Sequence, residues 1–397
     1  MTDTGIGKKT VRDIDTKGKR VLVRADLNVP IENGVVTDDT RIRESLPTIR
    51  YLLEQGAKVI VCSHLGRPTG KDESLSLAPV AGRLGNLLGR EVLFVEDCIG
   101  PEVERAVREM SPSHVLLLEN LRFHPEEEKN DPEFARQLAA NADVFVNDAF
   151  GAAHRAHAST EGVTHYLPAV AGFLMEKEVR YLSALVANPP KPFAAVVGGA
   201  KVSSKIPAIE HLLPKLDMLL LGGGMANTFL NATGVNVQMS LVEDDLLAKA
   251  SEIITGARAR GVELFLPVDV VAAERFAADS GTETVSVGRV PRGYMILDIG
   301  PQTVKAYSEA LKSAKAVVWN GPMGVFEMEK FSHGSFDLAR AIAGLHATTV
   351  AGGGETAAVV AQAGLAKQFT HVSTGGGASL EMLEGRELPG VASLLDA

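Results

Sequence analysis

The chain has 397 residues, of which 45% are hydrophobic and 22% charged, a balance that excludes a disordered chain. Its 40 Lys and Arg against 49 Asp and Glu give a net charge of −9, which argues against nucleic acid as a partner. Two cysteines are too few for a disulfide framework, and no apolar run has the length of a membrane-spanning helix or a secretory signal. We therefore expect a cytoplasmic protein with no membrane partner.

Short aliphatic runs alternate along the chain with longer segments of helical spacing, which is the pattern of βαβ units that form a parallel sheet. The predicted strands of the first half are residues 20–24, 57–62, 92–95, 115–118 and 144–146. Those of the second half are residues 193–197, 218–221, 262–266, 316–319, 348–351 and 371–374. The sequence therefore predicts an α/β fold with two sets of parallel strands.

A helix and a proline-rich turn separate the two sets of strands. Residues 173–187 have helical spacing, and three prolines follow within residues 189–192, where a helix must end. We predict two doubly wound, Rossmann-like lobes with parallel sheets, joined by a helix and hinge at residues 173–192. The first lobe is expected to span residues 1–172 and the second residues 193–380.

Basic and polar segments follow the strands of the first half, at the edge of a parallel sheet where ligands bind. They are residues 24–28, 63–67, 119–122 and 147–155. Arginine offers a planar fork that holds a carboxylate or phosphate through two hydrogen bonds. The first lobe is therefore predicted to bind a small anion with several charges.

Glycines follow the strands of the second half instead, at residues 198–199, 222–224, 321, 352–354 and 375–377. A single glycine pair is common in any tight turn, but five such turns favour phosphate binding by backbone N–H groups and helix N-termini. Lys201 and Lys205 are four residues apart, and we expect them on one face at the start of a helix, beside the phosphates. The second lobe is predicted to bind a nucleotide.

Motifs for a P-loop nucleotide site, a dinucleotide-binding site and a metal site are absent or incomplete in this sequence. No P-loop motif is present. Gly352, Gly354 and Ala357 match a dinucleotide-binding motif, but Ser373 and Thr374 stand where a dehydrogenase needs an acidic residue. An NAD-dependent oxidoreductase is therefore an alternative. His154 and His157 could form a metal pair, although Arg155 beside them would repel a cation.

Taken together, eleven segments resemble the phosphoglycerate kinase family, in order along nearly the whole chain. They are RADLNVP, TRI around Arg41, SHLGRP, LENLRFH, DAFGAAHRAHAS, GFLMEKE, GGAKVSSKI, LGGGMANTF, WNGPMGVFE, GGGET and STGGGASLE. The resemblance implies a kinase that reversibly transfers a phosphoryl group between 1,3-bisphosphoglycerate and ADP, giving 3-phosphoglycerate and ATP. It also implies a monomer whose residues 381–397 return to the first lobe and whose two lobes close on their ligands.

The resemblance assigns roles to residues of matching motifs. The 3-phosphoglycerate site of the first lobe would be formed by Asp26, Leu27, Asn28, Arg41, His64, Leu65, Gly66, Arg67, Arg122 and Arg155. The nucleotide site of the second lobe would be formed by Lys205, Gly222, Gly223, Pro322, Val325, Glu327, Gly353, Gly354, Glu355 and Thr356. The catalytic groups would be Arg41, Lys201, Lys205, Gly376 and Gly377.

One position departs from the family. Where members usually have an Asp that ligates the Mg²⁺ of the nucleotide, this chain has Glu355. Glutamate keeps the charge and the oxygen ligands but is one methylene longer, so metal use is expected to differ. We expect an active kinase with Mg²⁺ as cofactor and Glu355 as its ligand, and a non-catalytic nucleotide- or anion-binding relative of the kinase as the other alternative.

Overall fold

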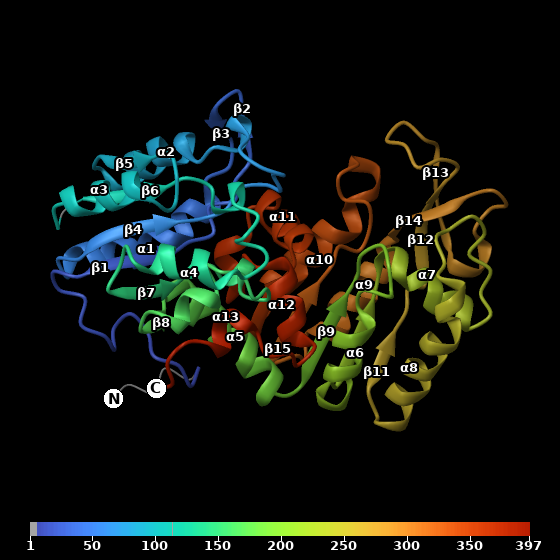
Figure 1. Ribbon diagram of the computed structural model, residues 1–397. Coiled ribbons are helices and arrows are strands. Elements are labelled where there is room, and N and C mark those ends of the chain that lie inside the picture. Colours follow the sequence, from blue (N-terminus) through green and yellow to red (C-terminus); the bar gives the residue numbers. More distant parts are fainter. Residues whose placement is uncertain (1–5, 113) are drawn as a thin grey trace. The chain divides into compact units, whose positions relative to one another are not determined.

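The computed structural model describes residues 6–112 and 114–397, and the chain divides into two compact units. The first unit contains the chain up to Arg180 together with Glu387–Ala397, and the second is Tyr181–Arg386. Each unit has a central six-stranded parallel sheet with helices around it (Figure 1). The predicted α/β class with two parallel-sheet lobes is confirmed.

The sheet of the first unit consists of neighbouring parallel strands, with Val21 opposite both Val59 and Val144. The order across the sheet is β5 (Val92–Val95), β6 (Val115–Leu118), β4 (Lys58–Cys62), β1 (Arg20–Arg24), β7 (Val144–Asn147) and β8 (Ala169–Ala171). The sequence predicted all of these strands except β8, which has three residues and is too short to show a pattern.

The helices of the first unit cover a core built from alternate residues of the strands. They are α1 (Thr40–Glu54), α2 (Ala78–Leu88), α3 (Pro101–Glu109) and α4 (Pro132–Ala139), and a short hairpin of β2 (Ile31–Glu32) and β3 (Val35–Val36) precedes α1. Val21 and Val59 pack with Ile49 of α1 and Leu84 of α2, all without exposed surface. This packing fixes the carboxyl ends of the strands, and the loops that follow them, in place.

The sheet of the second unit has the strand order typical of dinucleotide-binding folds, 3-2-1-4-5-6 in chain order within the sheet. Across the sheet the strands are β11 (Glu263–Phe265), β10 (Met218–Leu221), β9 (Phe193–Val197), β15 (Ala316–Asn320), β16 (Thr348–Gly352) and β17 (His371–Val372). The order reverses between β9 and β15. Ligands of such sheets bind beyond the carboxyl ends of the strands at this reversal.

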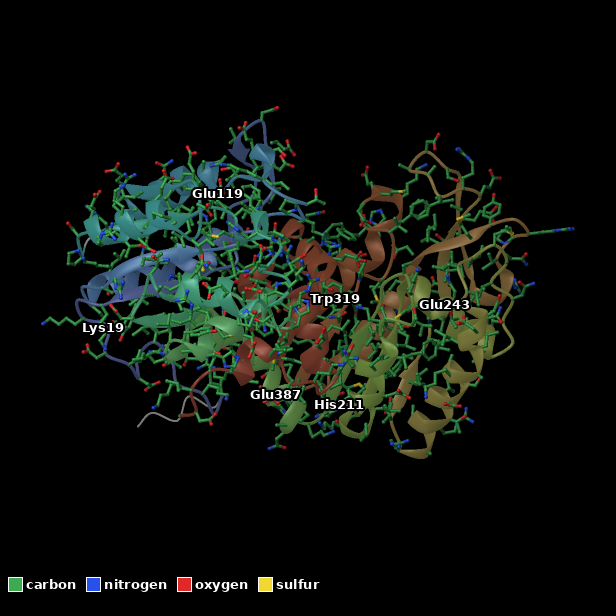
Figure 2. The ribbon with its side chains drawn as sticks, viewed as in Figure 1. Lys19, Glu119, His211, Glu243, Trp319 and Glu387 are labelled. Carbon is green, nitrogen blue, oxygen red and sulfur yellow. The ribbon has the colours of Figure 1, made fainter. Side chains whose placement is uncertain are left out.

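Helices surround the parallel sheet of the second unit (Figure 1). They are α6 (Ile206–Leu212), α7 (Gly223–Ala232), α8 (Leu247–Ala259), α9 (Pro301–Leu311), α10 (His333–Ala343), α11 (Gly354–Gln362) and α12 (Gly376–Leu383). Trp319 of β15 is fully buried in the core and donates its indole N–H to the Gly321 carbonyl at 2.8 Å (Figure 2). The bond holds the turn after β15 against its own strand.

A three-stranded antiparallel sheet, which was not predicted, accompanies the parallel sheet of the second unit. Its order is β13 (Thr282–Ser286), β12 (Asp269–Ala273) and β14 (Met295–Ile299). Val270 and Ile296 pack against Leu230 of α7. The strand β13 is mostly exposed and polar, so its residues do not form the buried aliphatic run by which the other strands were recognised.

The predicted connecting helix is present as α5 (Phe173–Ala187), and it spans the division between the units at Arg180 and Tyr181. Asp148 caps its N-terminus, accepting hydrogen bonds from the N–H groups of Leu174 and Met175 at 2.9 and 3.2 Å. None of the described helices is both long and apolar enough to cross a membrane.

The last residues of the chain belong to the first unit. They include α13 (Pro389–Ala392), and the Lys9 N–H donates to the Leu395 carbonyl at 2.8 Å. The Gly390 N–H donates to the Ala153 carbonyl at 2.9 Å, while the Gly390 carbonyl accepts from the Asn147 side chain. The C-terminal residues therefore brace the loop that follows β7.

Candidate functional site

The predicted anion-binding residues lie in the loops at the carboxyl end of the first unit's sheet. Asp26 follows β1, His64 follows β4, Arg122 follows β6 and Arg155 follows β7. In this sheet the connections from β1 lead to β4 on one side, while β7 lies on the other. The loops thus surround the point where a ligand is expected in an open parallel sheet. We call this set of loops the basic site.

Arg41 joins the basic site from α1 by an ion pair with Asp26. Its Nη1 lies 2.7 Å from the Asp26 Oδ2, and the carboxylate side chain is only 4% exposed. Asn28 accepts a hydrogen bond from the Gly66 N–H at 3.0 Å, so the loops after β1 and β4 are held together. Asp26 therefore holds the position of the Arg41 guanidinium, whose side chain keeps 36% of its surface exposed.

Three further arginines differ in how tightly the fold holds them. Arg122 has a side chain that is 9% exposed, donates to the Gly66 carbonyl at 2.7 Å and lies 3.1 Å from Glu128. Arg155 is half-buried and its Nε donates to His154 at 3.2 Å, whereas Arg67 is exposed. Arg122 is thus fixed in the protein, and Arg67 is open to a ligand.

Behind these groups lies a buried series of hydrogen-bonded polar side chains, of which the sequence analysis had assigned only His64 to the site. Arg24, 1% exposed, donates to Ser159 Oγ at 2.8 Å, and its Nη2 lies 3.0 Å from His64 Nδ1. Glu127, with no exposed surface, accepts hydrogen bonds from the Ser159 hydroxyl and N–H at 2.6 and 3.0 Å. Arg24 therefore orients His64 from below instead of facing a ligand.

Glu127 is a site residue that the sequence did not reveal. It stands within a run of three glutamates, residues 126–128, which reads as an ordinary solvated acidic turn. Burial raises the pKa of the Glu127 carboxyl, and the nearby Arg24 opposes that shift. Only the structure shows that one of the three acidic side chains points inward to balance the buried arginine.

Two histidines of the basic site, His64 and His157, are neutral near pH 7. Burial and the charges of Arg24 and Arg122 hold the pKa of His64 well below its usual range, and the same causes lower the pKa of His157 to about 4. Because arginine can only donate, the His64 Nδ1 accepts from Arg24 and the ring proton sits on Nε2. His64 can therefore donate one hydrogen bond without adding charge.

In the second unit, three of the glycine turns are bonded to one another. The Gly199 N–H donates to the Pro322 carbonyl at 2.9 Å, and the Gly223 N–H donates to the Met323 carbonyl at 3.0 Å. Gly223 has φ +65°, and a Cβ there would lie 2.7 Å from the Gly199 nitrogen. These glycines allow close packing of the loops, and the N–H groups of Gly199 and Gly223 are used for hydrogen bonds within the protein.

Backbone N–H groups without an intrahelical partner lie instead at the N-termini of α11 and α12. Their first hydrogen bonds to a preceding carbonyl are made by Ala357 and Ser379, so the N–H groups of the earlier residues in each first turn face outward. A Cβ on Gly376 would lie 3.3 Å from the Gly354 nitrogen, which places the two N-termini side by side. Two positive helix ends therefore converge on one point.

Lys205 is a partly buried lysine that lies beside these helix ends, whereas Lys201 is exposed to solvent. The Lys205 ammonium donates to the side-chain oxygen of Asn320. Burial lowers the pKa of Lys205, while the charges of Glu355 and Glu384 act in the opposite direction. Lys201 is exposed, and α6 begins only at Ile206, so the expected pair of lysines on one helical face is wrong. Both lysines lie in the preceding turn.

An apolar pocket of about 440 Å³ opens next to the glycine turns. The predicted residues Pro322, Val325, Glu327, Gly223 and Glu355 line it. Its other lining residues are Gly199, Ala200, Gly224, Asn227, Met239, Leu241, Phe276, Met295, Ile296, Leu297 and Gly324. Several of these lie in the antiparallel sheet or its loops, which the sequence did not reveal.

The remaining predicted residues lie at helix starts or at buried loop positions. Gly222 is the N-cap of α7, Gly353 is the N-cap of α11, and Gly377 is exposed in the first turn of α12. Thr356 accepts a hydrogen bond from the Gly321 N–H at 2.7 Å, which joins the turn after β15 to α11. Leu27 and Leu65 are buried, and their N–H groups donate to the Ser63 hydroxyl at 2.9 Å and to the Asn120 side-chain oxygen at 3.1 Å.

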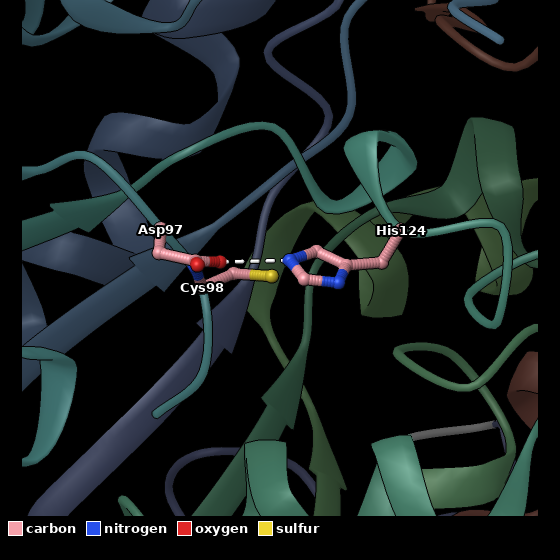
Figure 3. Close-up of side chains that lie close together, drawn as sticks. All are labelled: Asp97, Cys98 and His124. Atoms are coloured by element: carbon pink, nitrogen blue, oxygen red, sulfur yellow. Dashed lines mark hydrogen bonds and ion pairs between the residues drawn. The ribbon is translucent and has the colours of Figure 1, made fainter. Parts of the chain in front are cut away.

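A separate cluster of groups that can bind metals lies at Asp97, Cys98 and His124 (Figure 3). The His124 Nε2 lies 2.7 Å from Asp97 Oδ1, and the Cys98 N–H donates to the same oxygen at 2.7 Å. Burial raises the pKa of the Cys98 thiol well above its usual value and that of Cys62 to about 12. The direct hydrogen bonds account for this cluster, and Cys62 and Cys98 are both buried and form no disulfide.

Comparisons with known proteins match the chain over nearly its whole length. The sequence model of a family described as phosphoglycerate kinase matches residues 11–386. The phosphoglycerate kinase of Moorella thermoacetica is 59% identical over 392 residues, which cover 98% of this chain and 100% of that protein. The cytosolic phosphoglycerate kinase of Triticum aestivum is 58% identical over 393 residues, 98% of each chain.

A solved structure agrees with these sequence matches. The structure of phosphoglycerate kinase from Coxiella burnetii has a TM-score of 0.88 and 42% sequence identity to this chain. The match covers 97% of this chain and 98% of that one.

The depressed pKa of His157 predicts a particular acid sensitivity. The unfolded imidazole binds its proton near pH 6.5 and the folded one near 4, so the unfolded state holds more protons between these values. The stabilisation that neutral His157 contributes is therefore fully present above pH 6.5. It is lost as the pH falls from 6.5 through the folded pKa of about 4. The melting temperature of the variant His157→Gln should therefore fall less between pH 7 and pH 4 than the melting temperature of the parent protein does. Parallel curves for the two proteins would contradict this assignment.

Proposed function

Because the chain belongs to the phosphoglycerate kinase family and therefore catalyses reversible phosphoryl transfer between 1,3-bisphosphoglycerate and ADP, we propose which of its residues perform that reaction. The basic site of the first unit holds 3-phosphoglycerate, and the helix N-termini and apolar pocket of the second unit hold the nucleotide. The observation that carries this assignment is the pair of adjacent helix N-termini at Gly354 and Gly376, with Lys205 beside them.

On the substrate side, the proposal assigns the distal phosphate to Arg67, Arg122 and Arg155. An arginine held by the protein, such as Arg122, loses little freedom on binding, and guanidinium groups match a phosphate through paired hydrogen bonds. The substrate hydroxyl and carboxylate would face Asp26, Asn28, His64 and the backbone of Leu27, Leu65 and Gly66. The proton on His64 Nε2 supplies a neutral donor there.

On the nucleotide side, the base enters the apolar pocket beside Pro322 and Val325, and the ribose hydroxyls meet Glu327. The phosphates reach the N–H groups of Gly353, Gly354 and Thr356 and the first turn of α12. An anion at two helix N-termini is stabilised by both dipoles and by the outward N–H groups.

The chemistry requires positive charge and no general base. The carboxylate of 3-phosphoglycerate ionises near pH 4, as Asp and Glu side chains do, so it is already a nucleophile at pH 7. It is nonetheless repelled by the γ-phosphate. Arg41, Lys205, Lys201 and the N–H groups of Gly376 and Gly377 are assigned to offset this repulsion in a site with little water. Motion about residues 173–192 would bring the two ligands together.

Glu355 is the group assigned to hold the Mg²⁺ of the nucleotide. Its exposed carboxylate stands in the first turn of α11 and lines the pocket, and hard oxygen ligands suit this ion. When bound, the ion neutralises phosphate charge.

The remaining assignments concern the whole chain. We propose that it acts as a monomer in the cytoplasm on small-molecule substrates alone. We also propose that residues 1–172 and 193–380 are its two ligand-binding domains, with residues 381–397 as the returning segment.

An assay of ATP consumption with 3-phosphoglycerate, coupled to removal of the product, tests the catalytic assignment. Lys205→Ala should lower kcat on the order of 10²-fold or more, as when one donor is removed from an oxyanion site. Lys312→Ala is the matched control, because that exposed lysine pairs only with Glu309 among the partners described for it. A Lys205→Ala enzyme with near-normal kcat would remove its catalytic role.

The activity assay and a thermal-stability measurement separate the kinase from its two alternatives, the non-catalytic binding protein and the oxidoreductase. Activity dependent on both 3-phosphoglycerate and ATP excludes a non-catalytic binding protein. Thermal stabilisation by NAD, but not by ADP with Mg²⁺, would favour the oxidoreductase.

Metal dependence tests the role of Glu355. The longer side chain is expected to raise the preference for Mn²⁺ over Mg²⁺, both in turnover and in affinity for ADP, relative to the variant Glu355→Asp. Titrations of each metal against both proteins measure this ratio. Identical titration curves for the two proteins would show that the extra methylene has no effect on the metal.

A further inference from the structure

Asn227 is an unusual residue of the apolar pocket. It lies on α7, its side chain is only 1% exposed, and it lines the pocket together with Met239 and Leu241. Neither its amide nitrogen nor its amide oxygen has a hydrogen-bond partner among the described residues. Both halves of a buried amide are thus unsatisfied at the wall of a cavity that admits a ligand.

Other buried polar side chains of the protein show how exceptional this is. Asn120 donates to the carbonyls of Leu65 and Leu75, and its oxygen accepts from backbone N–H groups. Asn147 likewise uses both halves of its amide. Thr228, next to Asn227 on α7, accepts a hydrogen bond from the Glu243 N–H at 3.1 Å. A buried amide without a partner costs free energy, and a ligand group that pairs with the Asn227 amide would recover that cost.

The composition of the pocket shows what could satisfy the amide. Among the described residues that line it, only Asn227, Glu327 and Glu355 have polar side chains, and both glutamates are exposed. Asn227 is therefore the one buried polar side chain of this wall. A ligand group that meets it must be flat enough to enter between apolar side chains and must carry a donor and an acceptor next to each other.

We propose that the Asn227 amide recognises the 6-amino edge of the adenine base, an inference that rests on the nucleotide site proposed above. Its oxygen accepts a hydrogen bond from the 6-amino group, and its nitrogen donates to the adjacent ring nitrogen. An asparagine amide matches adenine in this paired way because adenine presents a donor beside an acceptor. Asn227 is thus a specificity-determining residue for the nucleotide.

Binding of two nucleotides to the full-length protein tests this role without any variant. The probes are ADP and purine riboside 5′-diphosphate, which lacks only the 6-amino group, each titrated in the presence of Mg²⁺ by calorimetry. The protein should bind ADP about tenfold more tightly, the effect of one hydrogen bond and a partner left unpaired. Equal affinities would overturn the proposal.

The variant Asn227→Leu assigns the preference to this side chain. It should bind both nucleotides with the affinity that the parent has for the analogue. Its ligand-free melting temperature should equal or exceed that of the parent, because an unsatisfied amide is removed. Asn231→Leu is the matched control, the same change one turn further along α7 at a residue outside the pocket lining, and it should keep the tenfold preference.

Two results would contradict the assignment to Asn227. One is an Asn227→Leu protein that keeps the preference for ADP, and the other is an Asn227→Leu protein that is less stable than the parent without ligand. A parent protein that binds neither nucleotide would instead overturn the nucleotide site itself. The failure of this inference is therefore distinct from that of the proposed function.

Discussion

Repulsion between anions is the constraint on which the molecule depends. A phosphorylated carboxylate and a nucleotide must meet although each carries several negative charges, and water would screen them only at the cost of hydrolysis. In the function that we propose, fixed cations and helix ends offset this charge. Arg41 is held by Asp26, Arg122 by the Gly66 carbonyl, and Lys205 by Asn320. No acid or base needs to change its proton during the transfer, so the groups that matter are those that stay charged.

The groups that hold the cations in place include a buried charge, and burying a charge costs free energy unless an opposite charge lies nearby. Arg24 is buried behind the basic site and is balanced by Glu127 through Ser159. Removing one member of such a chain would leave a buried charge uncompensated, which destabilises far more than a surface pair can contribute. In the second unit the equivalent support is the backbone contact between glycine turns, where Gly223 has no room for a side chain.

The sequence predicted the parallel strands and the convergence of basic groups, because aliphatic runs and strand ends follow simple periodic rules. It did not predict the antiparallel sheet, whose exposed strand β13 is polar, nor the inward turn of Glu127 within an acidic run. It also placed Lys201 in a helix that begins five residues later. These differences arise where tertiary packing, and not local pattern, decides which side of the chain is buried.

The central claim is that the two ligands bind on different units of the chain. Hydrogen–deuterium exchange of the full-length protein, with 3-phosphoglycerate alone and with ADP and Mg²⁺ alone, tests it most directly. We predict that 3-phosphoglycerate protects residues 63–67 and 119–123, and that the nucleotide protects residues 353–357 and 375–379. Protection of the same unit by both ligands, or of neither set of loops, would contradict the account.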